Sequence, residues 1–220
     1  MRILLNRDIL LSKRRTLQKH VMMTTALPYT KASLHHIATI LKQGGVAIIP
    51  TDTVYGLVCH PDFPEALERI RQLKQRDRTK PFQWLMASVE NVWADGAYRT
   101  AETEAVAAFW PGALTVVMTT QDGRAEGYRV PDDSALQTLL EHCGGALRAT
   151  SVNISGEPPA VSLQDVPDTI RTAVDCIVDG GTIPAAAAST VIQITPENNI
   201  ILLRSGALAD HILAQVKSNE

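Results

Sequence analysis

Four short polar segments carry the side chains of this sequence that are best suited to hold charged ligands. The first, Lys74 to Lys80, reads KQRDRTK and places four cations within seven residues. Arginine offers a planar fork to phosphate oxygens and lysine offers a point charge, so Lys74, Arg76 and Lys80 together could bind a triphosphate. A solvated helix end is the alternative, because cations are favoured at the C-terminus of a helix.

The other three segments adjoin predicted strands. Residues 150–156 (TSVNISG) follow a strand and place small polar side chains before a glycine, which is also the composition of an ordinary turn. Ala188-Ser189-Thr190 enters a strand, and Arg204-Ser205-Gly206 leaves one. The sequence contains neither GxxxxGK[ST] nor a GxGxxG that opens a helix after a strand, so a nucleotide site here would be of another type. No catalytic triad, carboxylate pair or metal-ligand cluster stands out.

Hydrophobic periodicity predicts the elements that position these segments. Apolar residues recur at helical spacing from Lys31 to Gln43, and a β-branched run from Val46 to Ile49 ends at Pro50. A second helix is predicted from Pro64 to about Lys74. Further strands are predicted at 82–87, 114–119, 146–150, 176–179, 190–194 and 200–203, and further helices at 102–109, 134–142, 163–172 and 208–216.

Strands and helices alternate irregularly and without a fixed repeat. This pattern predicts an α/β or α+β layer fold with a mixed sheet. Polar loops at the ends of strands are where ligand sites usually lie in such folds, and three of the four polar segments fall there, while the first follows the second predicted helix and precedes the strand predicted at 82–87.

The composition is that of an ordinary globular domain. The 220 residues are 45% hydrophobic and 20% charged, which permits one large core. The net charge of −2 leaves nucleic acid only a local basic patch to bind. No apolar run approaches the roughly 20 residues needed to cross a bilayer, so we expect no membrane span. Cys59, Cys143 and Cys176 are widely spaced, which predicts no disulfide framework and a reducing cytoplasm.

The N-terminal segment leaves several interpretations open. Residues 2–20 carry six cations against one acid, Asp8, and their apolar stretch is too short for a secretory signal. The segment could be a disordered tail, a targeting segment, or sequence ahead of a natural start at Met22 or Met23. We expect a single domain over residues 23–220, with residues 1–22 a disordered or non-native extension.

The polar segments belong to an ordered series of motifs. These are PTDTVYGL at 50–57, KQR at 74–76, KP at 80–81, FWPGALT at 109–115, RVP at 129–131, SVNISG at 151–156, STV at 189–191 and LRSG at 203–206. In this order and spacing, the sequence resembles the YrdC-like threonylcarbamoyl-AMP synthase family, in its short single-domain branch. The resemblance implies a twisted mixed sheet with flanking helices and a deep, positively lined cavity.

The resemblance also implies roles for individual residues. L-threonine would be held by Thr53, Arg129, the backbone near Ala149, and Ser189. ATP would be held by Arg76, Lys80, Ser151 and Arg204. The implied catalytic set is Lys74, Arg76, Ser151 and Asn153. Two departures from the family pattern affect the expected threonine pocket: Thr150 replaces a proline, and Leu85 replaces a histidine near threonine.

The implied activity is the synthesis of threonylcarbamoyl-AMP and pyrophosphate from L-threonine, bicarbonate and ATP, for threonylcarbamoyladenosine modification of tRNA. Mg²⁺ would accompany ATP, and downstream threonylcarbamoyl-transferase proteins would use the product. An alternative is a double-stranded RNA-binding or ribosome-maturation module on the same fold, since a concave basic surface can receive RNA phosphates. A second alternative is a diverged relative that binds nucleotide without synthase activity.

Overall fold

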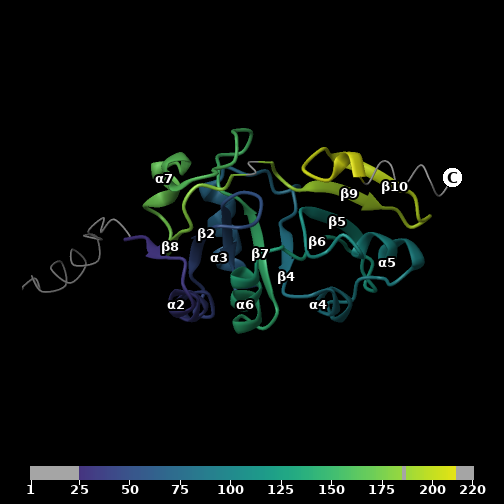
Figure 1. The fold of residues 1–220 in the computed structure, drawn as a ribbon, viewed down its shortest axis with the longest axis horizontal. Coiled ribbons are helices and arrows are strands. Elements are labelled where there is room, and N and C mark those ends of the chain that lie inside the picture. Colours follow the sequence, from purple (N-terminus) through teal and green to yellow (C-terminus); the bar gives the residue numbers. More distant parts are fainter. Residues whose placement is uncertain (1–24, 185–186, 212–220) are drawn as a thin grey trace, which may run out of the picture.

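A computed structural model describes residues 25–184 and 187–211 of the chain. The described residues form a ten-stranded sheet in the order β1-β8-β2-β3-β7-β4-β6-β5-β9-β10, with helices on both sides (Figure 1). The strands are β1 (Leu27–Pro28), β2 (Val46–Ile49), β3 (Gly56–Cys59), β4 (Gln83–Met86), β5 (Leu114–Thr119), β6 (Ala125–Arg129), β7 (Ala146–Ser151), β8 (Cys176–Asp179), β9 (Thr190–Ile194) and β10 (Ile200–Arg204). The α-helices are α2 (Lys31–Leu41), α3 (Pro64–Leu73), α4 (Val89–Ala94), α5 (Ala101–Ala107), α6 (Ser134–His142) and α7 (Asp168–Arg171).

The sheet is mixed, as the sequence predicts. Strands β1, β8 and β2 run parallel to one another, whereas β2, β3, β7 and β4 pair antiparallel. In the other half of the sheet β4 pairs parallel with β6, and β5 pairs antiparallel with β6 and parallel with β9. Strand β10 closes the series as the antiparallel partner of β9.

Side-chain caps and a proline fix where several helices begin. The Thr30 hydroxyl accepts a hydrogen bond from the Ser33 amide at the start of α2. Asp133 accepts from the amides of Ala135 and Leu136 at the start of α6. These side chains satisfy amides that a first helical turn leaves unpaired. Helix α3 begins with Pro64, whose missing N–H costs nothing at that position.

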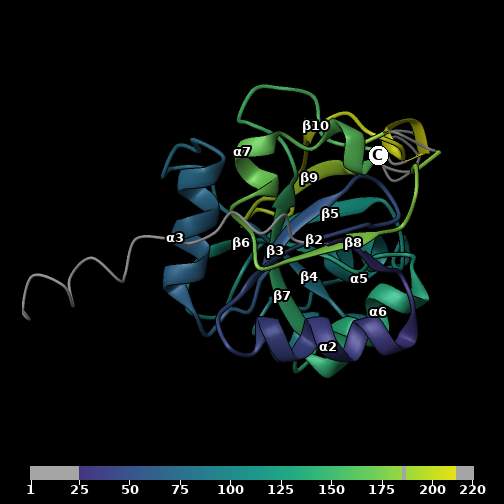
Figure 2. The same cartoon turned by 90° about the vertical axis from the view of Figure 1, so that its left-hand side faces the viewer.

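Three hydrophobic clusters hold the helices to the sheet. The first joins α2 and α6 to one face of the central strands, where Figure 2 shows the two helices side by side. The second packs α3 and α7 against the opposite face of β2 and β3. The third joins α4 and α5 to β5, β6 and β9 in the other half of the molecule. Side chains of successive strand residues point to opposite faces, which lets one sheet serve all three clusters.

The predicted bounds of β2, β5, β8, β9 and α6 are confirmed residue for residue. The sequence prediction missed β1, β3, β6 and α4. It was wrong to make residues 163–172 one helix, because a short 3-10 helix at Leu163–Asp165 and α7 are separated at Pro167, whose ring lacks an N–H donor. Of the helix predicted at 208–216, residues 209–211 are helical, and 212–216 lie outside the described residues, as does the predicted extension at 1–22.

The three cysteines are free thiols within the core. Cys59, Cys143 and Cys176 are each buried. Burial raises the pKa of Cys59 to about 12, that of Cys143 to about 11 and that of Cys176 to about 11. Within residues 25–184 and 187–211, no helix combines the length and hydropathy needed to cross a bilayer.

Candidate functional site

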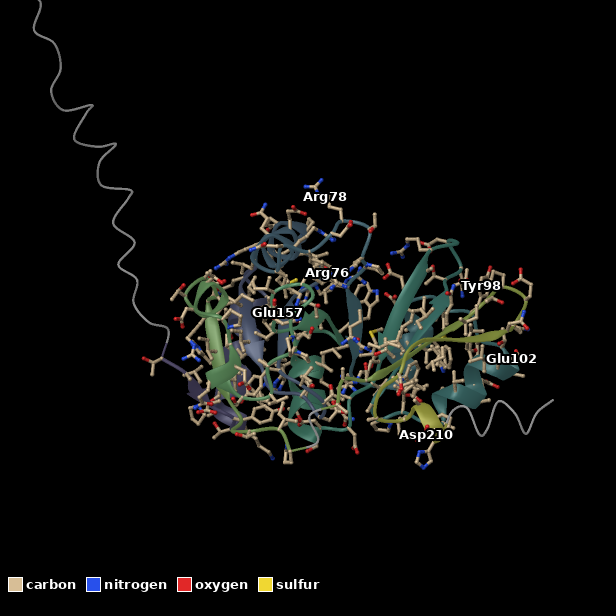
Figure 3. All side chains as sticks on the ribbon, turned by 90° about the horizontal axis from the view of Figure 1, so that it is seen from above. Arg76, Arg78, Tyr98, Glu102, Glu157 and Asp210 are labelled. Atoms are coloured by element: carbon tan, nitrogen blue, oxygen red, sulfur yellow. The ribbon has the colours of Figure 1, made fainter. Side chains whose placement is uncertain are left out.

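A cleft of about 840 Å³ opens along the face of the sheet that also carries α2 and α6. This volume lies within the range typical of small-molecule sites. Of the ten predicted site residues nine line the cleft, namely Thr53, Arg76, Lys80, Arg129, Ala149, Ser151, Asn153, Ser189 and Arg204. Figure 3 shows Arg76 and Glu157 near the middle of the molecule, with Tyr98 and Glu102 toward one end. The cleft therefore brings together residues that lie more than 150 positions apart in the sequence.

The floor of the cleft is formed by alternate strand residues, whose side chains point to one face of the sheet. In β5, Thr115 and Val117 lie two residues apart and so point to the same face of the sheet. In β6, Gly127 and Arg129 do the same, and all four residues line the cleft. Gln83 of β4 and Ala149 of β7 are register partners on the same face. Three of the polar segments identified in the sequence reach this floor from the ends of β7, β9 and β10, and the fourth, the basic loop, reaches it from the end of α3.

Arg129 is the most deeply buried cation of the cleft, with 2% of its surface exposed. Its Nη1 donates to the Thr53 hydroxyl over 2.8 Å, its Nε donates to the Gly112 carbonyl over 3.2 Å, and its Nη2 forms an ion pair with Asp52. A buried charge is tolerated only when it is paired and hydrogen-bonded. Asp52 is thus the partner that allows Arg129 to lie here, and the sequence analysis did not identify it.

The turn after β2 aims Thr53 at Arg129. The Thr51 hydroxyl donates to the Val54 carbonyl over 2.7 Å and accepts from the amides of Thr53 and Val54 over 3.2 and 3.3 Å. Threonine hydroxyls commonly close turns by bonding the backbone two or three residues further on. The PTDT sequence therefore makes a rigid turn that places the hydroxyl of Thr53 on the cleft wall.

Arg204 and Ser189 form one hydrogen-bonded unit. The Nε and Nη2 atoms of Arg204 donate to the Ser189 carbonyl over 3.1 and 2.8 Å, and Nη2 also donates to the Ser189 hydroxyl over 3.0 Å. Burial, together with the positive charge of Arg129, lowers the pKa of Arg204. No ion pair with an acid forms at Arg204 among the described residues, so its charge is available to an anion.

The basic loop after α3 turns sharply into the cleft. Gln75 has a φ of +50°, in the left-handed region, and follows directly on the last turn of the helix. Arg76 then donates from Nε to the Lys80 carbonyl over 3.3 Å and from Nη2 to the Pro81 carbonyl over 2.9 Å, with its guanidinium 5.4 Å from the centre of the Phe82 ring. Burial and the nearby Arg71 lower the pKa of Arg76. The loop thus holds Arg76 in one orientation.

Lys74 is the predicted site residue that does not line the cleft. Only 1% of its surface is exposed, and its ammonium group donates to the carbonyls of Ser151 and Asn153 and, over 2.7 Å, to Oδ1 of Asn153. The same Oδ1 accepts a hydrogen bond of 2.6 Å from the Ser151 hydroxyl. Lys74 therefore lies behind the cleft wall and holds the loop that carries Ser151 and Asn153. Burial and the charge of Arg76 lower the pKa of Lys74 to about 7.

The two residues that depart from the family pattern, Thr150 and Leu85, lie in different surroundings. Thr150 lines the cleft, so this position does contribute to its wall. Leu85 is 1% exposed, packs in the cluster beneath α2 and α6, and is not among the residues that line the cleft. The residue that β4 presents to the cleft is Gln83, two positions earlier on the same face. The apolar pattern of a short strand did not show which of its residues would reach the cleft.

The fold and the site define a class of protein: a mixed α/β sheet with a ligand-sized cleft lined by cations and hydroxyls, suited to anionic ligands. The family model of Sua5/YciO/YrdC proteins, described as "Telomere recombination", matches residues 39–206. This match covers most of the chain, and the chain belongs to that family.

Known relatives agree with this assignment. A threonylcarbamoyl-AMP synthase of Pyrococcus abyssi is 32% identical over 181 residues, which are 78% of this chain and 53% of that protein. The Vibrio parahaemolyticus protein of that name is 32% identical over 162 residues, covering 68% of this chain and 88% of the relative. The crystal structure of P. abyssi Sua5 complexed with L-threonine superposes with a TM-score of 0.80 at 28% identity, covering 88% of this chain and 61% of that one. The chain thus spans about half to two thirds of the P. abyssi protein.

We predict that Asp52→Ala destabilises the protein by about 3–5 kcal/mol, because it leaves the buried Arg129 guanidinium without its acid. Urea denaturation measures the loss. Glu104→Ala is the matched control, since it removes the acid paired with the exposed Arg99 and should change stability little. Equal losses in the two variants would contradict a structural role for the buried pair.

The lowered pKa of Lys74 predicts a pH dependence of stability. Between pH 7 and 10.5 the unfolded chain keeps a proton on this lysine that the folded protein has lost, so the free energy of unfolding rises with pH by up to about 1.4 kcal/mol per unit. Lys74→Met lacks this rise. The gap between wild type and variant in urea denaturation should widen by up to about 2 kcal/mol from pH 7.5 to 9. Lys42→Met changes an exposed lysine after α2 and controls for the loss of one charge. The prediction is refuted if the difference in free energy of unfolding between wild type and Lys74→Met stays constant with pH.

Proposed function

We propose that this protein is a threonylcarbamoyl-AMP synthase, a nucleotidyltransferase that forms threonylcarbamoyl-AMP and pyrophosphate from L-threonine, bicarbonate and ATP. The observation that carries the proposal is the convergence of nine residues, chosen from sequence motifs, on one cleft. The proposal is further supported by relatives named threonylcarbamoyl-AMP synthase and by the P. abyssi structure with L-threonine.

Two adjoining subsites account for the charges of the cleft. Arg76, Lys80 and Ser151 would hold the phosphates of ATP, since a guanidinium fork and an ammonium suit phosphate oxygens. Thr53, Arg129, Ser189 and the backbone at Ala149 would hold L-threonine, with hydroxyls and a guanidinium matching a zwitterion. The hydrogen bonds between Arg204 and Ser189 link the two subsites, so the two substrates would meet at this pair.

The reaction requires that L-threonine and ATP lie next to each other. The amino group of threonine attacks the carbon of bicarbonate, and loss of water leaves an N-carboxylate. An oxygen of this carboxylate attacks the α-phosphorus of ATP, the bond to the oxygen that bridges to the β-phosphorus breaks, and pyrophosphate leaves with that oxygen. Reacting atoms must approach to about 3–3.5 Å, which positioned cations achieve without any side-chain nucleophile. Arg204 would neutralise charge at the junction, and Arg76 and Lys80 would hold the departing pyrophosphate.

Mg²⁺ would enter with ATP. Among residues 25–184 and 187–211, no group of three or more His, Cys, Asp and Glu is arranged to hold a metal ion. Mg²⁺ in nucleotide sites is commonly held by one or two carboxylates together with substrate phosphates, and Glu157 is an acid on the cleft wall that fits this role. The ion would supply charge neutralisation on the triphosphate.

The product would serve tRNA. Its threonylcarbamoyl group would pass, through downstream transferase proteins, to form threonylcarbamoyladenosine, and this role fits a cytoplasmic enzyme. Double-stranded RNA is the competing ligand of the same basic loop, where Arg78 is largely exposed beside Arg76. The assays below separate the two ligands.

We predict that pyrophosphate release from ATP requires L-threonine and bicarbonate together, because the attacking carboxylate exists only after both have combined. A coupled pyrophosphate assay measures release with each substrate omitted in turn. Equal release without threonine would reject the synthase and indicate a nucleotide hydrolase.

The two subsites predict opposite effects of two variants. Arg76→Ala should weaken ATP binding about 10- to 150-fold and threonine binding much less, while Thr53→Ala should do the reverse, because a guanidinium serves phosphate and this hydroxyl serves the amino acid. Calorimetry of each ligand measures this, with a non-hydrolysable ATP analogue and Mg²⁺ present during threonine titrations. If Arg76→Ala keeps its ATP affinity but loses binding of double-stranded RNA, the basic loop is an RNA surface.

A further inference from the structure

Gln83 is a cleft residue to which the motifs assign no role. It is the first residue of β4, half-buried on the cleft floor, and its register partner in β7 is Ala149. Leu85, the next residue on the same face, is buried in the core and offers no polar group. Gln83 is therefore the residue through which β4 presents hydrogen-bonding atoms to the cleft.

A directed chain of hydrogen bonds orients the Gln83 carboxamide. Arg204 can only donate, so the Ser189 hydroxyl accepts its hydrogen bond of 3.0 Å. The Thr115 hydroxyl donates to Oε1 of Gln83 over 3.1 Å. Because Thr115 has one hydroxyl proton, the 2.8 Å bond between Thr115 and Ser189 must use the proton of Ser189. The chain therefore ends on the carboxamide oxygen and leaves Nε2, with two N–H groups, without a hydrogen-bond partner among the described residues.

The neighbouring backbone keeps this nitrogen accessible. Gly127 of β6 lies opposite Gln83, and a Cβ at that position would lie 3.9 Å from the Cβ of Gln83 and 3.6 Å from Cγ2 of Thr115. These are ordinary van der Waals distances, so a side chain would fit and would occupy space above the floor. Glycine here leaves room for a ligand beside the carboxamide.

We propose that Gln83 binds the amino-acid substrate, with Nε2 donating to one of its anionic oxygens, and that Thr115 is the positioning residue that fixes the carboxamide. This rests on the proposed function. The neighbours of Gln83 favour the amino acid over the nucleotide, since Ala149 is its register partner and Ser189 is two hydrogen bonds away, and both belong to the proposed threonine subsite. The same donor would remain available to the carboxylate that forms on the threonine nitrogen.

Calorimetry on substituted proteins tests the proposal, with L-threonine titrated in the presence of a non-hydrolysable ATP analogue and Mg²⁺. Gln83→Leu should weaken threonine binding about 10-fold or more, as expected for loss of a hydrogen bond to a charged group, and should change affinity for the analogue less than about twofold. Gln193→Leu is the matched control, because it makes the same change at a half-buried strand position of β9 outside the cleft. Gln83→Ala replaces Gln83→Leu if the leucine variant misfolds.

The donor assignment has its own test in Gln83→Glu. A carboxylate at this position would repel an anionic oxygen, so threonine binding should weaken at least as much as in Gln83→Leu. Tighter binding would show that the carboxamide oxygen faces the substrate ammonium, and would overturn the assignment.

The positioning role of Thr115 is tested by Thr115→Val, which keeps side-chain volume and removes the hydroxyl. Its loss of threonine affinity should be smaller than that of Gln83→Leu, and the double variant should lose less than the two single losses combined, because both act through one donor. Fully additive losses would overturn this role. Wild-type protein that fails to bind threonine would reject the proposed function itself, whereas normal threonine binding by Gln83→Leu would reject only the role of Gln83.

Discussion

The shape of the cleft wall depends on the hydrogen bonds of the buried ammonium group of Lys74. This group joins the end of α3 to the loop after β7 through two carbonyls and one side-chain oxygen, and so fixes two segments about 77 residues apart in the chain. Removing an ammonium from water is costly, as the lowered pKa of Lys74 shows, and the three acceptors offset part of that cost only while the loop keeps its shape. The left-handed turn at Gln75 then sends Arg76 to the opposite side of the wall. Lys74 faces the interior and Arg76 faces the cleft, which explains why a single residue separates the two cations.

The cleft cations are held by different kinds of partner, and the difference sets the electrostatics of the site. Arg129 is paired with an acid, whereas Arg76 and Arg204 are anchored by neutral carbonyl oxygens. A neutral anchor orients a guanidinium without cancelling its charge. The site is therefore organised before a ligand arrives, which limits the reorganisation that binding or reaction requires.

The sequence predicted the strongly apolar elements and the polar segments of the site, but not how side chains combine. Strand β2 is four consecutive apolar residues and was predicted correctly, whereas β6 reads AEGYR and shows no strand pattern because Glu126 is paired with arginines and Gly127 floors the cleft. The motifs placed Lys74 and Arg76 in one set, and only the packing of α3 separates the residue behind the wall from the residue on it. Asp52, Thr115 and Gln83 escaped notice because their roles depend on the register of strands that are distant in sequence.

The three buried cysteines make the protein convenient for site-directed labelling. With pKa values of about 11 and 12, their thiols carry almost no thiolate at neutral pH, and burial shields them from reagents. A maleimide dye should therefore react selectively with a cysteine introduced on the surface, with the native thiols left in place. Dyes attached at exposed positions that lie far apart on the molecule, such as Arg78 in the basic loop and Tyr98 before α5, would report by energy transfer whether the distance between them changes during turnover.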